Sequence, residues 1–341
     1  MKIFIILIIL FLFNKYAYSE DLFDTSFYDV NFVSNNIDNA KLTKINYIKK
    51  ESLINILNKT LNNKEFEKLK PFLSKDLINS FIKNIIINEE KIVGNKYFSK
   101  IKINFNKNNI IEFYRKNKIS YVEYYPKKFL LIIYDQNHLS ENLFSKNNNF
   151  YSFYKNNIKT DELFKIPNLD INDRYLLKKE HIKSKDYDKI SKFSKKYNLE
   201  EIIVVIAKSS NNKTNYNLFL ISENKIIEKE FTLNKNEYEV FFEILKFETL
   251  NIWKTINGIQ NNTVNKINCK IIYFNNLELK EIRNNLKKIS IIKNLNIKSL
   301  SFKTNEYDIN YYGNLKILTN IFKMNKLDIN NSKNKCVIRL K

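Results

Sequence analysis

Residues 267–289 read INCKIIYFNNLELKEIRNNLKKI, and this stretch decides the fold class of the chain. Its first half alternates apolar and polar side chains with the period of a half-buried strand. Its second half carries an apolar residue at every third or fourth position, which is the spacing of one helix face: Leu279, Ile282, Leu286 and Ile289. A strand followed directly by a helix is typical of an α+β unit.

The sequence after this stretch continues the same unit. Residues 291–302 and 307–311 have the pattern of two strands, residues 315–322 that of a second helix, and residues 337–340 that of a last strand. The order β-α-β-β-α-β is that of a ferredoxin-like unit. We therefore expect a ferredoxin-like C-terminal domain over residues 261–341.

Two further α+β units are expected before it, so that the chain is a series of two or three small mixed units. The predicted N-terminal domain covers residues 20–120, with strands at 27–33, 85–91 and 96–105 and helices at 41–61, 64–70, 75–82 and 110–117. The predicted central domain covers residues 121–260, with buried strands at 129–134 and 201–207, strands at 216–221 and 226–233, and helices at 186–197 and 236–257.

The first residues predict export. Lys2 precedes eleven residues without a polar side chain, Ile3 to Phe13, and Ala17-Tyr18-Ser19 offers a small-residue cleavage site. A membrane span needs about 20 apolar residues, more than this run provides. We therefore expect a signal peptide over residues 1–19, cleaved near Ser19, and a soluble periplasmic protein without a lipid anchor.

The two cysteines, Cys269 and Cys336, leave two interpretations open. Disulfides persist outside the cytoplasm, so the pair could be bridged; alternatively, both are small buried apolar residues. In a ferredoxin-like sheet the first and last strands are antiparallel neighbours, and Cys336 would then lie opposite Phe274. This register argues against a disulfide.

The net charge of +22 comes almost entirely from lysine. An exported chain rarely meets nucleic acid, and the excess of Lys, Asn, Ile, Phe and Tyr over Gly, Ala and Arg is the profile of an AT-rich gene. No block of five or six like charges occurs. We expect no nucleic-acid partner, and keep an anionic membrane surface as an alternative partner.

Further segments resemble a known family. They are YYPKKFLLII at 124–133, IPNLDINDR at 166–174, KYN at 196–198, a helical Trp253 and YYGNL at 311–315. With the signal peptide, they resemble an exported proteobacterial family known only as a domain of unknown function, series two thousand and sixty-six. Where that family usually has Arg-Pro before the apolar strand, this chain has Tyr125-Pro126. The resemblance implies export and a similar architecture, but no activity.

The sequence contains no strong motif for catalysis or for binding a cofactor or metal. Three glycines are too few and too scattered for a phosphate-binding loop, and the two histidines, His138 and His181, lack the spacing of a zinc site, so we expect no cofactor and no metal. The cluster of Asp170, Asp173 and Arg174 could bind a cation or a ligand carboxylate; alternatively, the aspartates cap a turn or helix and Arg174 pairs with one of them.

A second candidate is the aromatic stretch of Tyr121, Tyr124 and Tyr125, which is either an interaction surface or a linker packed by its rings. We expect a non-enzymatic interaction or scaffold module that contacts other envelope proteins. A hydrolase with its site in the central domain is one alternative. A module that binds anionic lipid is another.

Overall fold

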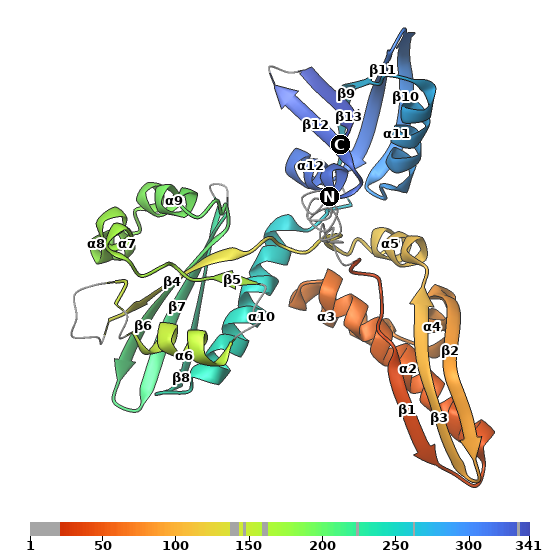
Figure 1. Cartoon of the computed structure of the whole chain (residues 1–341), viewed down its shortest axis with the longest axis horizontal. Helices are drawn as coiled ribbons and strands as arrows, with labels where there is room; N and C mark the ends of the chain where they lie inside the picture. The colour runs from red at the N-terminus through yellow and green to blue at the C-terminus, as the bar shows by residue number, and fades with distance from the viewer. Residues whose placement is uncertain are drawn as a thin grey trace, which may run out of the picture. The chain divides into compact units, whose positions relative to one another are not determined.

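The computed structural model of the chain describes residues 21–136, 143–145, 148–158, 163–222, 225–261, 263–332 and 335–341. It confirms the α+β class, with helices and β-sheets in a series of small units (Figure 1). The predicted signal peptide lies outside these residues. None of the helices described is long and apolar enough to cross a membrane.

The chain divides into two compact units. Unit 1 combines the described residues of Met1–Leu61 with Glu65–Tyr125 and Ile259–Lys341, and unit 2 combines Asn62–Lys64 with Pro126–Gly258. The chain therefore leaves unit 1 after Tyr125 and returns to it at Ile259. Unit 2 is an insertion within unit 1.

The N-terminal part of unit 1 is a three-stranded antiparallel sheet in the order β1-β3-β2. Alternate residues of β3 are buried, as the period of two requires, and α2 packs on that face with Leu53, Ile56 and Leu57. The elements are β1 (Tyr28–Val33), α2 (Ile37–Thr60), α3 (Asn63–Leu69), α4 (Lys75–Phe81), β2 (Ile82–Val93), β3 (Lys96–Phe105) and α5 (Lys107–Lys116).

Helix α5 ends in a conformation that normally requires glycine. Lys118 has φ of 54°, the N–H of Ile119 donates to Tyr114 O at 2.8 Å, and the N–H of Lys118 donates to Arg115 O at 3.1 Å. This is the Schellman motif, in which a left-handed residue after the helix is usually Gly. With three glycines in the whole chain, lysine occupies this position instead.

Replacing Lys118 with glycine is expected to stabilise unit 1 by about 1 kcal/mol, because glycine adopts positive φ without the steric cost that lysine has. Lys118 is exposed, so the change removes no packing. The midpoint of urea unfolding measures the effect. Lys116→Gly is the matched control, since glycine inside the same helix is expected to destabilise it by about 1 kcal/mol. Equal effects of the two changes would contradict the prediction.

The C-terminal part of unit 1 keeps the predicted β-α-β-β-α order and adds one strand. Its elements are β9 (Val264–Ile272), α11 (Asn276–Lys288), β10 (Ile292–Ser301), β11 (Thr304–Tyr312), α12 (Leu315–Met324), β12 (Leu327–Ser332) and β13 (Lys335–Leu340), and the sheet order is β10-β11-β9-β13-β12. The sequence analysis missed β12. This strand reverses the chain, so that the last strand, β13, runs parallel to β9.

The extra strand overturns the argument against a disulfide. In the parallel pairing Cys336 lies opposite Cys269, not opposite Phe274. The two residues form a disulfide with Cα atoms 4.5 Å apart, and both are buried. The bridge joins neighbouring strands of one sheet across a sequence separation of 67 residues.

Contacts between distant segments hold the two parts of unit 1 together. Arg115 on α5 donates from Nη2 to Ser290 O at 2.6 Å, and its guanidinium carbon lies 4.7 Å from the centroid of the Tyr312 ring. Tyr121 and Ile259 form an antiparallel bridge in which Ile259 N donates to Tyr121 O at 2.7 Å. The segments of unit 1 that precede and follow unit 2 are therefore paired with each other.

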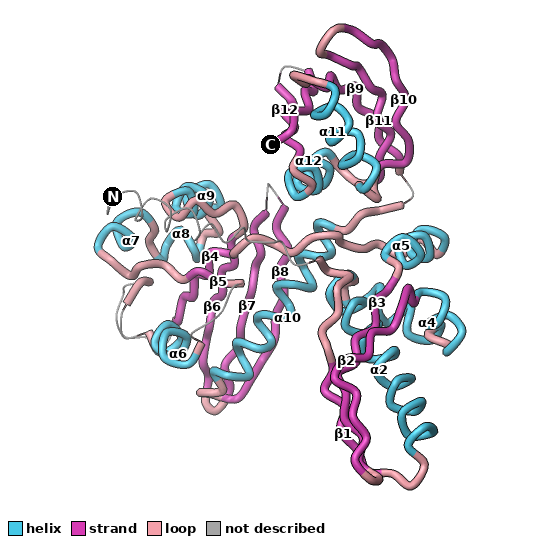
Figure 2. The backbone as a smooth tube through the Cα atoms, turned by 45° about the vertical axis from the view of Figure 1, so that its right-hand side comes forward, coloured by secondary structure: helices cyan, strands magenta, loops and turns pink. Residues whose placement is uncertain are grey.

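Unit 2 contains a five-stranded mixed sheet in the order β5-β4-β6-β7-β8 (Figure 2). Strands β5, β4 and β6 are parallel, and β7 and β8 continue the sheet antiparallel. Its elements are β4 (Phe129–Asp135), α6 (Asn149–Asn157), β5 (Phe164–Lys165), α7 (Ile171–Leu176), α8 (Lys179–Lys183), α9 (Tyr187–Lys195), β6 (Ile202–Ser210), β7 (Lys213–Ser222), β8 (Lys225–Asn234) and α10 (Tyr238–Asn257).

Helices cover both faces of this sheet. Tyr216 and Phe219 on β7 are three residues apart and so point to opposite faces. Tyr216 stacks on Phe241 of α10 with centroids 4.6 Å apart, whereas Phe219 meets Tyr187 at the start of α9, with centroids 6.4 Å apart. This arrangement explains why the predicted strand at 129–134 is apolar on both sides.

Candidate functional site

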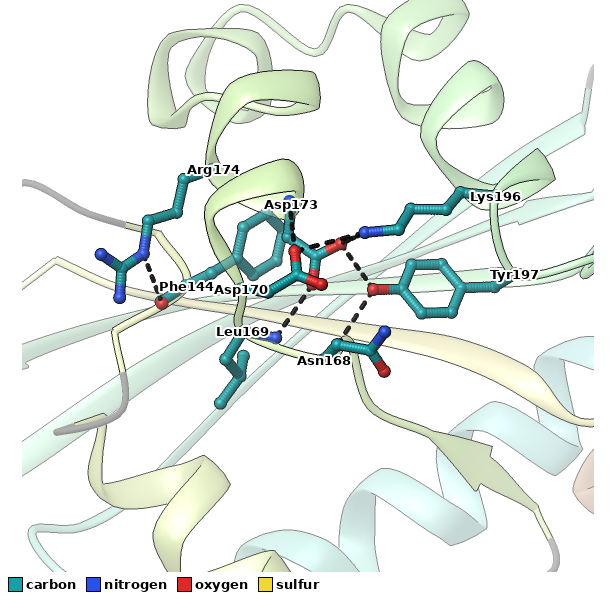
Figure 3. A network of polar contacts seen from close by, with 8 residues as sticks. All are labelled: Phe144, Asn168, Leu169, Asp170, Asp173, Arg174, Lys196 and Tyr197. Atoms are coloured by element: carbon teal, nitrogen blue, oxygen red, sulfur yellow. Dashed lines mark hydrogen bonds and ion pairs between the residues drawn. The ribbon is translucent and has the colours of Figure 1, made fainter.

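The predicted cluster around Asp170 lies at the start of α7 in unit 2 (Figure 3). Asp170 is the N-cap of α7, and its Oδ1 accepts a hydrogen bond from Asp173 N at 2.8 Å. The capping role considered for the aspartates is therefore present. The same oxygen lies 3.3 Å from Lys196 Nζ.

Asp173 is fully buried, and both of its carboxylate oxygens have partners. Oδ2 accepts from Leu169 N at 2.9 Å. Oδ1 accepts from the Tyr197 hydroxyl at 2.5 Å and from Lys196 Nζ at 2.7 Å. A buried carboxylate needs this degree of compensation, and the contacts join α7 to the end of α9.

The pKa shifts in the cluster stabilise the charged forms of Asp170 and Lys196 and the neutral form of Tyr197. Hydrogen bonding from Asp173 N, together with Lys196, holds the pKa of Asp170 below its usual value. Burial tends to lower the pKa of Lys196, but its hydrogen bonds to Asp173 and Asp170 outweigh that effect and raise it. Burial, and donation to Asp173, raise the pKa of Tyr197. Each group thus keeps its ordinary protonation state near neutral pH, as in a structural ion pair.

Arg174 does not join this network. Its Nε donates to Phe144 O at 3.2 Å, and Figure 3 shows its side chain directed away from both aspartates. The predicted pairing of Arg174 with an aspartate is wrong, because Lys196 occupies that position. Sequence reasoning missed Lys196 because 23 residues separate it from Asp173.

The network also supports a strained turn. Leu169 is buried, and its φ of 62° lies in the left-handed region, which leucine rarely adopts. The N–H of Leu169 donates a hydrogen bond to Asp173 Oδ2, and the N–H of Asn168 donates to the Tyr197 hydroxyl at 3.0 Å. With every oxygen of Asp173 engaged, the cluster acts in this structure as an anchor for the turn before α7.

The aromatic stretch is largely buried. Tyr121 and Tyr124 are 1% and 7% exposed, and Arg115 donates to the Tyr121 hydroxyl at 3.3 Å. Asn320 donates to the Tyr124 hydroxyl at 3.3 Å. Tyr125 is 37% exposed. Two of the three rings are therefore packed against other residues, as expected for a linker packed by its rings.

Unit 2 also contains a small cavity that was not predicted from the sequence. It has a volume of about 200 Å³ and lies where β4 and β6 end and where α6 and α10 begin. Its lining is mostly polar, with Asp135 and Lys235 as its charged residues and Asn149, Phe150, Ser209, Thr214, Tyr216, Asn236 and Tyr238 as the others. The carboxyl ends of parallel strands are the usual place for ligands in such sheets.

Only the fold brings the lining of this cavity together. Asp135 and Ser209 become neighbours because β4 and β6 pair in parallel, with Asp135 opposite Ala207. Lys235 and Asn236 come from the turn before α10. No spacing in the sequence connects these segments, so pattern analysis had no signal to use.

The described part of the chain contains no group of three or more His, Cys, Asp and Glu side chains that could hold a metal ion. His181 accepts a hydrogen bond from Lys178 N at its Nδ1, at 3.1 Å, and so caps the first turn of α8. His138 lies outside the described residues.

Comparison with known proteins adds no assignment. No protein-family model matches the chain. Nor does any curated protein or any solved structure.

Proposed function

We propose that this chain is an exported, non-enzymatic interaction module of the cell envelope. The Cys269–Cys336 disulfide supports an oxidising location such as the periplasm, in agreement with the predicted signal peptide. The resemblance to an exported family points the same way. The closed network around Asp173 supports a structural role for the main polar cluster found in the sequence.

The observation that carries the proposal is the free edge of the N-terminal sheet. Strand β2 is 12 residues long, and β3 is its one partner among the strands described. Ile85, Ile92 and Val93 on this strand are 36%, 59% and 65% exposed. Native proteins usually keep edge strands short or cover them, because free N–H and C=O groups accept another strand.

The partner that fits this edge is an extended segment of another envelope protein, bound by strand addition. Main-chain hydrogen bonds would supply the affinity, and the exposed apolar side chains the selectivity. Register shifts between Ile82 and Asn84 and between Asn88 and Lys91 interrupt the edge. The segment between them, Asn84 to Asn88, is therefore the proposed docking strand.

Photo-crosslinking in cells tests this proposal. A benzophenone amino acid at position 85 is expected to capture a partner protein, whereas the same group at Tyr47 is not. Tyr47 lies on α2 and is 58% exposed, so it controls for accessibility. Recovery of the chain only as an uncrosslinked monomer with the group at position 85 would contradict the proposal.

The hydrolase alternative has one observation in its favour. The cavity lined by Asp135 and Lys235 brings two charged side chains together at the carboxyl edge of the parallel strands. Turnover of a chromogenic ester that the Asp135→Asn variant loses would favour a hydrolase over an interaction module.

A further inference from the structure

One end of the C-terminal part of unit 1 carries a group of large apolar side chains in contact with solvent. Their exposed fractions are 90% for Phe302, 80% for Phe274, 79% for Leu277, 64% for Leu300 and 55% for Ile297. We call these five residues the apolar tip. Single exposed apolar residues are common, whereas several on neighbouring segments are typical of an interaction site.

The β10–β11 hairpin reaches beyond α11 (Figures 1 and 2). Ile297 and Leu300 lie on β10, and Phe302 lies in the turn that joins β10 to β11. Tyr273 N donates to Lys303 O at 3.2 Å, which puts the end of β9 beside the turn of the hairpin. Phe274 therefore lies close to Phe302, and Leu277 follows it in the first turn of α11.

The register of the hairpin shows which face the tip occupies. Ile297 lies opposite Tyr307 and Leu300 opposite Asn305, and directly paired residues share a face of the sheet. Tyr307 and Asn305 are buried. Ile297 and Leu300 thus belong to the face that carries the helices, at the end of the hairpin that the helices do not cover.

The apex of the hairpin has no evident role in folding. Phe302 and Lys303 form a two-residue turn between the paired Ser301 and Thr304. Lys303 adopts a φ of 59°, a conformation that favours glycine, and its Nζ lies 5.3 Å from the centroid of the Phe302 ring. A phenylalanine that is 90% exposed contributes almost no burial to the fold.

The positive charge of the chain is concentrated in the same part. Residues 261–341 contain 16 lysines and arginines against five aspartates and glutamates, which is half of the net charge of +22. Lys303 lies in the turn of the hairpin, and Lys298 lies on β10 before it. The nearby Glu278 carboxylate accepts from Phe274 N at 2.7 Å.

We propose that the apolar tip docks on an anionic lipid bilayer. A bilayer surface presents an apolar interior beneath a layer of phosphates, so it matches projecting phenylalanines beside lysines on a strongly basic module. The tip is a projecting hairpin, a shape suited to insertion. This contact is separate from strand addition at β2, and the two together would hold a partner protein at the membrane.

Vesicle flotation tests the docking. The mature chain is expected to float with vesicles of phosphatidylcholine and phosphatidylglycerol at low salt, and to bind much less to phosphatidylcholine alone. The double variant F274S/F302S is expected to lose about tenfold or more in apparent affinity, because two exposed aromatic rings no longer enter the bilayer. Phe72→Ser is the matched control, since Phe72 is 64% exposed at a different place in unit 1.

Three outcomes would overturn the proposal. The first is equal binding of neutral and anionic vesicles, and the second is binding that F274S/F302S leaves intact. The third is failure to float; a dimer in light scattering that the double variant abolishes would then assign the tip to a second copy of the chain. Thermal unfolding checks that the variants remain folded. None of these outcomes bears on crosslinking at β2, so the two proposals fail separately.

Discussion

Replacing Cys269 and Cys336 with alanine is expected to lower the free energy of unfolding of unit 1 by about 4 kcal/mol. The disulfide closes a chain separation of 67 residues that contains α11, β10, β11, α12 and β12. Cross-linking so long a loop removes much of the entropy of the unfolded chain. Alanine avoids placing new hydroxyl groups at two buried positions.

Scanning calorimetry with and without a reducing agent measures this effect. The wild-type chain under reducing conditions is expected to behave as the C269A/C336A variant does, and the transition of unit 2 is expected to stay in place in both. A thiol titration of the unfolded, unreduced chain should find almost no free thiol. A titre near two thiols per chain, or a melting profile insensitive to the reducing agent, would refute the bridge.

Replacing Asp173 with asparagine is expected to destabilise unit 2 by about 3 kcal/mol. The substitution leaves Lys196 without a buried charge partner and turns an amide N–H₂ toward one of the donors that the carboxylate accepts. Breaking one side of a buried ion pair costs more than losing an exposed pair. The value is at the lower end of the usual range because Lys196 is 26% exposed.

Asp170→Asn is the matched control for Asp173→Asn. Asparagine caps a helix as well as aspartate does, and the Asp170 side chain is 41% exposed, so stability is expected to change little. Hydrogen exchange locates the difference: the turn from Asn168 to Asp170 and helix α7 should open more readily in Asp173→Asn alone. Equal stability of the two variants would mean that the network does not hold α7 on α9.

Local patterns in the sequence predicted most elements of this fold. The strand at 129–134 and the helix at 236–257 lie within two residues of β4 and α10, because their apolar residues follow one clear period. The predicted start of α2 at residue 41 was late, since the helix begins at Ile37 and the Asn36 side chain accepts the capping hydrogen bond. These features depend on residues close together in the chain.

Pairings between distant segments could not be predicted from local patterns in the sequence. Strand β12 is short, and Asp328 and Asn330 give it a polar appearance, yet its presence reverses β13 and brings the cysteines together. The choice of Lys196 over Arg174 as the partner of Asp173 depends on where α9 ends relative to α7. The cavity and the apolar tip likewise arise from strand pairing, which leaves no periodic signal.

The pairing of the segments that precede and follow unit 2 has a mechanical consequence. Tyr121 and Ile259 bridge the outgoing and returning chain, and Arg115 ties α5 to Ser290. Tension applied between the N-terminal sheet and the C-terminal sheet therefore passes through these contacts and bypasses the 133 residues from Pro126 to Gly258. Force reaches the strands and helices of unit 2 only after the hydrogen bond of the Tyr121–Ile259 bridge has broken. Unfolding of unit 2 then lengthens the chain.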